Sequence, residues 1–461
     1  MARVVAIVGR PNVGKSTLFN RLTGSRKAIE GDRPGVTVDR IESRCRITPT
    51  CSVLLVDTGG IGEGGDHLLG RRMDARPDAA HIIQSAIEGQ VEAALEVADL
   101  VLFVVDGRSG PCAADHEIAG RLRSAAVRLL LVVNKAERSD AGWEFHALGL
   151  GEPLPVSAIH GRGIERLRER IAAALSVLPS EEAADEVHEE EASAAITVVG
   201  RPNVGKSTLI NRWLGHARMV VSPVAGTTRD AVDHMLPWKG GKIRLVDTAG
   251  VRKRARVRDA VEWVARIKAE QACARADAAV LLLDGSTGVA EQDLRLMQMA
   301  RAQGCALVVA VNKIDLLDRE GWRRYSDRLD FRMRGARGAV PRMRISAATG
   351  AGCDRLLAEA VAAAERNRFE AGTGALNRWL EMVQRQQHAP SDRGSVVRMK
   401  YITQVGTRPP TLKLFCNRPA TLKESYLRFL EQSFRDHFAL PGVPVRFILS
   451  ATTNPYVEQR R

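Results

Sequence analysis

The sequence predicts an α/β protein with two tandem P-loop domains, each a mostly parallel sheet covered by helices, followed by a small α+β domain. Three observations support this fold class. The ten residues GRPNVGKSTL occur twice, at 9–18 and at 200–209. In both halves short apolar runs alternate with longer helical patterns, which is typical of βα units. The repeat stops after Glu365, and the remaining pattern is helix, strand, strand, helix, strand.

Each half contains four apolar runs that are long enough for a strand. They cover residues 4–8, 53–56, 100–105 and 129–133 in the first half, and 196–199, 243–246, 278–283 and 306–311 in the second. Nearly continuous apolar runs indicate strands that are buried on both faces, as in a parallel sheet between helical layers. In the tail we expect a helix over 375–387, strands over 396–404 and 412–416, a helix over 422–437 and a strand over 443–449.

The same patterns predict the domain boundaries. We expect a first P-loop domain over 1–180, an acidic linker over 181–194, a second P-loop domain over 195–365 and a third, smaller domain over 366–461. Residues 181–191 hold seven acidic residues and no Lys or Arg, which is typical of a solvated, flexible linker. The alternative, a continuation of the preceding helix, is weakened by Pro179.

Composition bounds the location and the partners. No apolar run approaches the roughly 20 residues that cross a bilayer, and the first residues lack the hydrophobic region of a secretory signal. We therefore expect a cytoplasmic protein with no membrane partner. The seven cysteines are scattered and never form C-x-x-C, which favours buried free thiols over a disulfide framework or a zinc site.

The formal charge of +14 is unevenly distributed. Residues 1–180 carry a net charge of +1, residues 181–191 carry −7, residues 192–365 carry +11, and the last 96 residues carry +9. This asymmetry favours a polyanion as partner. The alternative is a codon bias that scatters Arg over the surface, because Arg outnumbers Lys by 56 to 12.

A loop with the spacing G-x-x-x-x-G-K-S follows the first strand of each half. Its backbone N–H groups and the next helix N-terminus converge on phosphate oxygens, the lysine reaches the β and γ phosphates, and the serine binds Mg²⁺. The phosphate-binding residues are Gly9, Arg10, Pro11, Asn12, Val13, Gly14, Lys15, Ser16 and Thr17, and in the second half Gly200, Arg201, Pro202, Asn203, Val204, Gly205, Lys206, Ser207 and Thr208.

A D-x-x-G motif ends a later strand in each half, where its carboxylate lies beside Mg²⁺ and its glycine N–H near the γ-phosphate. These residues are Asp57, Gly60, Asp247 and Gly250. A threonine between the P-loop and this motif completes the Mg²⁺ ligands when the γ-phosphate is present. Alignment of the halves selects Thr37 and Thr228, with Thr227 as the alternative in the second half. The expected Mg²⁺ ligands are Ser16, Thr37, Asp57, Ser207, Thr228 and Asp247.

The base is predicted from N-K-I-D at residues 312–315. The Asp315 carboxylate can accept hydrogen bonds from N1–H and the amine of guanine, whereas adenine lacks this donor pair. The second site therefore predicts GTP, and Glu137 in the equivalent place still favours guanine in the first. The base-pocket residues are Asn134, Lys135, Glu137, Ser157 and Ala158, and in the second half Asn312, Lys313, Asp315, Ser346 and Ala347.

With these duplicated motifs and a basic tail, the chain resembles the bacterial Der (EngA) family of double GTPases over essentially its whole length. The resemblance implies two GTPase domains, a KH-like C-terminal domain and a role in assembly of the large ribosomal subunit, with its rRNA as partner. No G-x-x-G occurs after Glu365, so the usual KH clamp on RNA backbone is missing from this sequence.

The chain also departs from many small GTPases, because Ile61 and Val251 stand where those have a water-orienting Gln. We expect catalysis by positioning and charge neutralisation from Lys15, Thr37, Gly60, Lys206, Thr228 and Gly250. In related GTPases an Asn at the position of Asn12 and Asn203 helps to bind K⁺, so the resemblance implies K⁺ as a second ion. The alternative is that each Asn is a plain turn residue.

We therefore predict a monomeric GTP hydrolase with two GTP sites that changes conformation on an RNA-rich partner. The alternative is an RNA-binding scaffold that holds GTP with little turnover at one or both sites. Two segments are expected to respond to nucleotide. One is a glycine-rich loop within 61–80, because the first half has twelve extra residues after its D-x-x-G motif. The alternative for this segment is a surface loop that lengthened by neutral drift. The other is the basic run 251–258, with five Lys or Arg in eight residues.

Overall fold

The computed structural model describes residues 3–24, 42–58, 91–92, 94–125, 127–136, 142–177, 192–216, 223–224, 233–246, 258–333, 340–387, 391–392 and 395–451. The chain divides into two compact units, one made of residues 1–183 with 253–268 and one made of 184–252 with 269–461. The expected linker over 181–194 and the switch segments 61–80 and 251–257 lie almost entirely outside the described residues. Among the described helices, none is long and apolar enough to cross a membrane.

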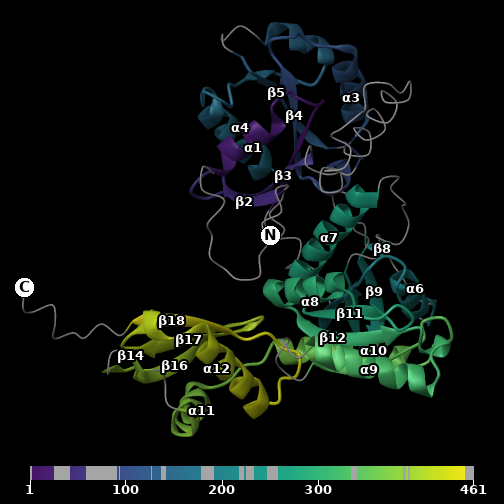
Figure 1. Ribbon diagram of the computed structural model, residues 1–461, viewed down its shortest axis with the longest axis vertical. Coiled ribbons are helices and arrows are strands. Elements are labelled where there is room, and N and C mark those ends of the chain that lie inside the picture. The colour runs from purple at the N-terminus through teal and green to yellow at the C-terminus, as the bar shows by residue number, and fades with distance from the viewer. Residues whose placement is uncertain are drawn as a thin grey trace, which may run out of the picture. The chain divides into compact units, whose positions relative to one another are not determined.

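The first unit contains a six-stranded sheet in the order β2-β3-β1-β4-β5-β6 (Figure 1). Its strands are β1 (Arg3–Val8), β2 (Glu42–Arg46), β3 (Ser52–Asp57), β4 (Leu100–Asp106), β5 (Arg128–Asn134) and β6 (Leu154–Pro155). Only β2 is antiparallel to its neighbour, β3. The four predicted strands are confirmed, whereas β2 and β6 were not predicted, because β2 is polar and β6 has two residues.

Helices cover both faces of this sheet. They are α1 (Lys15–Thr23), α3 (Ala113–Ser124) and α4 (Ile164–Ser176), with the 3-10 helix η3 (Trp143–Leu148). On β1, Val5 and Ile7 pack in one cluster with α1 and α4, while Val4 and Ala6 pack in another with α3. The apolar run 4–8 of this strand is buried on both faces, as its composition predicted.

The second unit repeats this arrangement in a seven-stranded sheet with the order β13-β12-β11-β7-β10-β9-β8. Its strands are β7 (Ala194–Val199), β8 (Pro223–Val224), β9 (Asp233–Trp238), β10 (Gly241–Leu245), β11 (Ala278–Asp284), β12 (Ala306–Asn312) and β13 (Arg342–Arg344). The helices are α6 (Lys206–His216), α8 (Glu291–Gln303), η5 (Ile314–Leu316), α9 (Arg319–Met333) and α10 (Cys353–Asn367). Helix α7 (Arg258–Arg275) is divided, because its residues 258–268 belong to the first unit and 269–275 to the second. The central strand order of the first sheet recurs here, so the internal duplication extends to topology.

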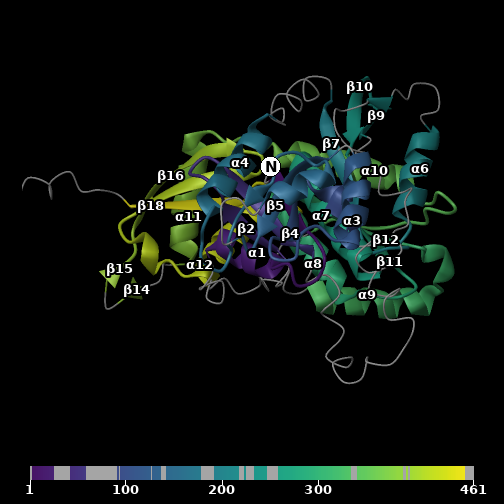
Figure 2. The ribbon, with the colours of Figure 1, turned by 90° about the horizontal axis from the view of Figure 1, so that it is seen from above.

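The C-terminal part forms a three-stranded sheet in the order β16-β17-β18 (Figures 1 and 2). Its elements are α11 (Thr373–Gln386), β14 (Ser391–Asp392), β15 (Ser395–Val396), β16 (Met399–Thr407), β17 (Pro410–Cys416), η6 (Pro419–Thr421), α12 (Glu424–His437) and β18 (Arg446–Ala451). The predicted order of helices and strands is confirmed. The last strand starts three residues later than expected. Val443 and Val445, which belong to the expected strand, are buried in the loop before it.

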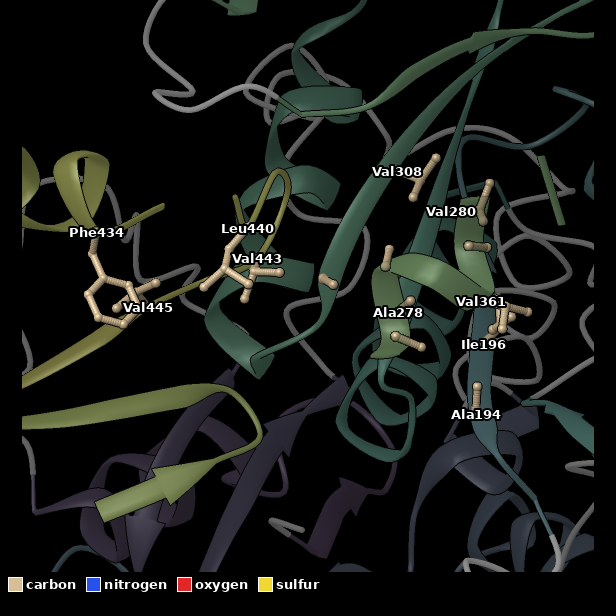
Figure 3. Packing of buried hydrophobic residues seen from close by; sticks show 14 of the residues in the cluster. Ala194, Ile196, Ala278, Val280, Val308, Val361, Phe434, Leu440, Val443 and Val445 are labelled. Carbon is tan, nitrogen blue, oxygen red and sulfur yellow. The ribbon is translucent and has the colours of Figure 1, made fainter. Parts of the chain in front are cut away.

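One apolar cluster joins this small sheet to the second GTPase-type domain (Figure 3). Ile196, Val280 and Val361 come from the larger sheet and its helix α10, whereas Phe434 and Val443 come from the C-terminal part. The two parts are also bonded through backbone, since Leu307 N donates to Gly442 O at 2.9 Å. The C-terminal part therefore shares the core of the second unit.

Candidate nucleotide-binding sites

Both phosphate loops have the same strained backbone, which only certain residues can adopt. Asn12 and Gly14 have left-handed φ angles of 66° and 92°, and Asn203 and Gly205 have 63° and 100°. A Cβ on Gly14 would lie 2.4 Å from Asn134 Nδ2, and one on Gly205 would lie 2.3 Å from the corresponding atom of Asn312. Glycine is required at both positions, because any side chain would displace the asparagine behind the loop.

Each loop holds its own lysine. Lys15 Nζ donates to Gly9 O and Arg10 O, both at 2.9 Å. Lys206 Nζ donates to Gly200 O at 2.7 Å and to Arg201 O at 2.8 Å. Burial lowers the pKa of Lys206 from its ordinary value to about 8. Both ammonium groups are thus held by carbonyl oxygens at the loop where the sequence predicts the β and γ phosphates.

A buried asparagine connects the phosphate loop to the base pocket in each half. Asn134 Nδ2 donates to Val13 O at 2.9 Å, and its Oδ1 accepts from Ala158 N at 3.0 Å. Asn312 makes the same two bonds, both at 2.8 Å, with Val204 O and Ala347 N. The structure therefore brings three predicted motifs together in each domain. We name this arrangement of the Asn between the two loops the asparagine bridge.

The lysine after each bridge asparagine pairs with an aspartate that was not among the predicted site residues. Lys135 Nζ lies 2.6 Å from Asp106 Oδ2, and Lys313 Nζ lies 2.6 Å from Asp284 Oδ2. Burial raises the pKa of Asp106, but the hydrogen bonds from Lys135 and the Arg108 backbone, together with the nearby positive charges, outweigh burial, so the net pKa is lowered. The pKa of Asp284 is lowered in the same way by Lys313 and Ser286, against the effect of burial. The recurrence of Asp-Gly after an apolar run in both halves was the available signal.

An arginine on the helix after each phosphate loop donates to the backbone of the Ser-Ala pair of the base pocket. Arg21 Nε donates to Ala158 O at 2.8 Å, and Arg212 Nε donates to Ala347 O at 2.8 Å. Neither arginine was among the predicted site residues. The signal was present, because Asn20-Arg21 and Asn211-Arg212 extend the ten-residue repeat beyond one substituted position.

The predicted Mg²⁺ ligands that the structure describes lie near the carboxyl ends of the strands in each sheet. Ser16 and Ser207 are second residues of α1 and α6. Asp57 ends β3, is 2 % exposed and is in register with Ile7 just before the first phosphate loop. A hydroxyl and a buried carboxylate at one strand edge fit Mg²⁺, which prefers hard oxygen ligands. The residues Thr37, Gly60, Glu137, Thr228, Asp247 and Gly250 lie outside the described residues.

Asp315 is exposed on the single turn η5, directly after Lys313, whose φ is 62°. In the sequence Asp315 follows the bridge residue Asn312 by three positions, which is the spacing of the predicted N-K-I-D motif. The left-handed φ of Asn12 and Asn203 is compatible with a turn role and does not test the K⁺ prediction.

Comparison with known proteins identifies the family of this chain. A family model described as "50S ribosome-binding GTPase" matches residues 4–135 and 195–313, and one described as "KH-domain-like of EngA bacterial GTPase enzymes, C-terminal" matches residues 371–449. The chain is 39% identical over 475 residues to the GTPase Der of Rhodopseudomonas palustris (strain HaA2), covering 100% of this chain and 99% of that protein. It is 40% identical over 468 residues to the GTPase Der of Azorhizobium caulinodans, covering 100% of both chains. The chain belongs to the Der family of GTPases, with P-loop GTPase domains and a KH-like C-terminal domain.

Proposed function

We propose that both sites of this GTPase bind and hydrolyse GTP, and that the protein is a nucleotide-controlled factor in assembly of the large ribosomal subunit. The asparagine bridge is the observation that carries the proposal. It occurs with the same partners in both halves, at 2.9 and 3.0 Å in one and at 2.8 Å twice in the other. A degenerate second site would have no reason to keep both bonds of this bridge.

The chain's own groups would act mainly by position and charge. The N–H groups at the start of α1 and α6 and the ammonium groups of Lys15 and Lys206 would neutralise charge on the transferred phosphate. Mg²⁺ would supply further charge neutralisation. It would be held by Ser16, Thr37 and Asp57 in the first site and by Ser207, Thr228 and Asp247 in the second. The apolar side chains of Ile61 and Val251 cannot orient water. We therefore propose that Asn12 and Asn203 contribute to K⁺ sites that replace an arginine finger.

The proposed partner is the rRNA of the large subunit. Residues 192–365 and 366–461 carry net charges of +11 and +9, so the second GTPase domain and the KH-like domain would attract a polyanion. A ribosomal partner would require the protein to work in the cytoplasm, and we propose that it acts there as a monomer. The alternative function is a GTP-binding RNA scaffold with little turnover.

Single-turnover hydrolysis separates these functions. Full-length Lys15→Ala leaves the second site, and Lys206→Ala leaves the first site. We expect each variant to hydrolyse one GTP per chain, whereas the double variant hydrolyses none. Lys239→Ala, an exposed lysine in a turn of the second unit, is the control and should behave like the parent. A single variant that binds GTP but leaves it intact would assign a scaffold role to the remaining site.

The ribosomal partner is tested by co-sedimentation with isolated large and small subunits. We expect the full chain to sediment with large subunits, and the bound fraction to differ between GDP, a non-hydrolysable GTP analogue and no nucleotide. Equal binding to both subunits in all three conditions would contradict a nucleotide-controlled role in large-subunit assembly.

A further inference from the structure

The sheet of the KH-like domain has one face that its helices cover and one that exposes large side chains. Leu412, Leu414 and Cys416 on β17 are buried in the same cluster as Trp379 of α11 and Phe434 of α12. Figure 1 shows both helices on the same side of this sheet. Because successive strand residues point to opposite faces, the side chains that alternate with the buried ones lie on the other face. We call this second side the open face.

Two aromatic rings stack on the open face. Tyr401 on β16 is paired in register with Phe415 on β17, and their ring centroids are 4.2 Å apart at an interplanar angle of 13°. The Lys413 ammonium lies 5.2 Å from the Phe415 ring centroid, on the same strand. Tyr401 is 44 % exposed, and Ile448, which is paired in register with Lys413, is 47 % exposed. This combination is an apolar platform with a cation at its edge.

The charge around the platform selects the kind of partner. Residues 395–423 contain no acidic residue and six Lys or Arg, of which Arg408 is paired with the buried Asp277 and five remain around the sheet. Residues 446–451 of β18, which pair with β17, also contain no acid. A protein partner would need no such uniform charge, whereas a chain of phosphates would. Planar rings beside cations suit a polyanion that also presents planar groups, which describes unpaired nucleotides.

We propose that the open face binds single-stranded RNA, with a base stacked on the Tyr401–Phe415 pair and Lys413 neutralising a neighbouring phosphate. In a duplex the bases stack on each other, so a base must be unpaired to reach the rings. This surface would supply the contact that the missing G-x-x-G cannot. The choice of RNA rests on the proposed function, whereas the stacking chemistry rests on the open face itself.

The test is fluorescence anisotropy of the full chain with a labelled oligoadenylate of about ten nucleotides, and with a hairpin duplex of the same length. The double variant Tyr401→Ala, Phe415→Ala should bind the oligoadenylate about 5- to 100-fold more weakly, with an unchanged salt slope. Lys413→Gln should reduce the salt slope by about one. Tyr401→Phe keeps the ring and should bind like the parent.

Phe331→Ala is the matched control, because Phe331 is an aromatic residue of α9 that is 67 % exposed, and its loss should leave oligoadenylate affinity unchanged. Thermal unfolding of each variant checks that the sheet still forms. The inference is wrong if the double variant binds the oligoadenylate within twofold of the parent, or if its affinity for the hairpin falls as much as its affinity for the oligoadenylate. It is also wrong if the double variant changes the hydrodynamic radius of the protein and leaves its RNA affinity unchanged. If the parent binds neither the oligoadenylate nor ribosomal subunits, the rRNA partner of the proposed function fails as well.

Discussion

Arg408 of the KH-like domain forms an ion pair with Asp277 of the second GTPase domain, at 2.6 Å between Nε and Oδ1. The Asp277 side chain is fully buried, and its Oδ2 also accepts from Ala195 N at 2.8 Å and from Arg368 at 2.9 Å. Asp99 is the equivalent aspartate of the first domain, since its Oδ2 accepts from Val4 N at 2.7 Å. Asp99, however, remains 27 % exposed and has Arg3 at 3.7 Å. The duplicated aspartate thus joins two strands in both domains, and in the second it also anchors the KH-like domain.

Asp277→Asn should therefore destabilise the second unit far more than Asp99→Asn destabilises the first. Removing one partner of a buried ion pair leaves two arginines without their counter-charge, and we expect a loss of about 2 to 4 kcal/mol in the free energy of unfolding. The exposed pair at Asp99 should contribute less than about 1 kcal/mol. Urea unfolding of both full-length variants measures this difference. Equal losses would show that the anchor contributes nothing beyond the strand bond.

Asn312→Ala should uncouple the phosphate loop from the base pocket of the second site. It leaves Val204 O and Ala347 N without their buried partners, which should lower the free energy of unfolding by about 2 kcal/mol and GTP affinity at that site by about tenfold or more. Asn377→Ala is the matched control, because Asn377 likewise bonds backbone groups through its side-chain amide, but within the KH-like domain. The control should lose stability and keep GTP affinity. Nucleotide titration of both variants, in a Lys15→Ala background, tests this.

GTP binding at the second site should take up a proton above pH 8. The pKa of Lys206 is lowered by burial to about 8, and a bound phosphate would raise it again. At pH 7 the lysine is already charged, so GTP binding takes up almost no proton. Between pH 8 and 10 the uptake approaches one proton per GTP bound, and GTP affinity falls by up to about tenfold per pH unit. Calorimetry of Lys15→Ala in two buffers of different ionisation enthalpy measures the uptake. A pH-independent affinity up to pH 9.5 would contradict it.

Asp315→Asn should exchange the base preference of the second site. The amide donates where the carboxylate accepted, so GTP affinity should fall by about 3 kcal/mol or more and xanthosine triphosphate should bind instead. The measurement is competition between the two nucleotides in the Lys15→Ala background. Unchanged GTP affinity would remove Asp315 from the base pocket.

Hydrolysis should be about tenfold or more faster in K⁺ than in Na⁺, since the ion is expected to replace an arginine finger. Asn203→Ala should abolish the difference at the second site, and so should Asn203→Gly. The glycine variant is decisive, because glycine accepts the left-handed φ of 63° without strain, so the variant loses the side-chain amide while the turn is kept. If Asn203→Gly keeps the K⁺ response, the asparagine is a turn residue.

Much of the candidate site could be predicted from the sequence because its motifs are local. The ten residues GRPNVGKSTL determine a loop and the start of a helix, and the glycines at 14 and 205 are needed for its backbone. The apolar runs likewise identified the central strands, since burial on both faces requires them to be apolar throughout. The outer strands β2, β6, β8, β9 and β13 were not predicted, because their identity depends on pairing with a neighbour more than on composition.

The tertiary structure decided the contacts between residues that are far apart in the chain. Arg21 and Ala158 are 137 residues apart, and Arg408 and Ala195 meet at Asp277 from different domains. Local spacing cannot predict such pairs, because they depend on strand order and register, which arise when the sheets assemble. For the same reason, Tyr401 and Phe415 were ordinary strand residues in the sequence. The antiparallel register of β16 and β17 makes them a stacked pair.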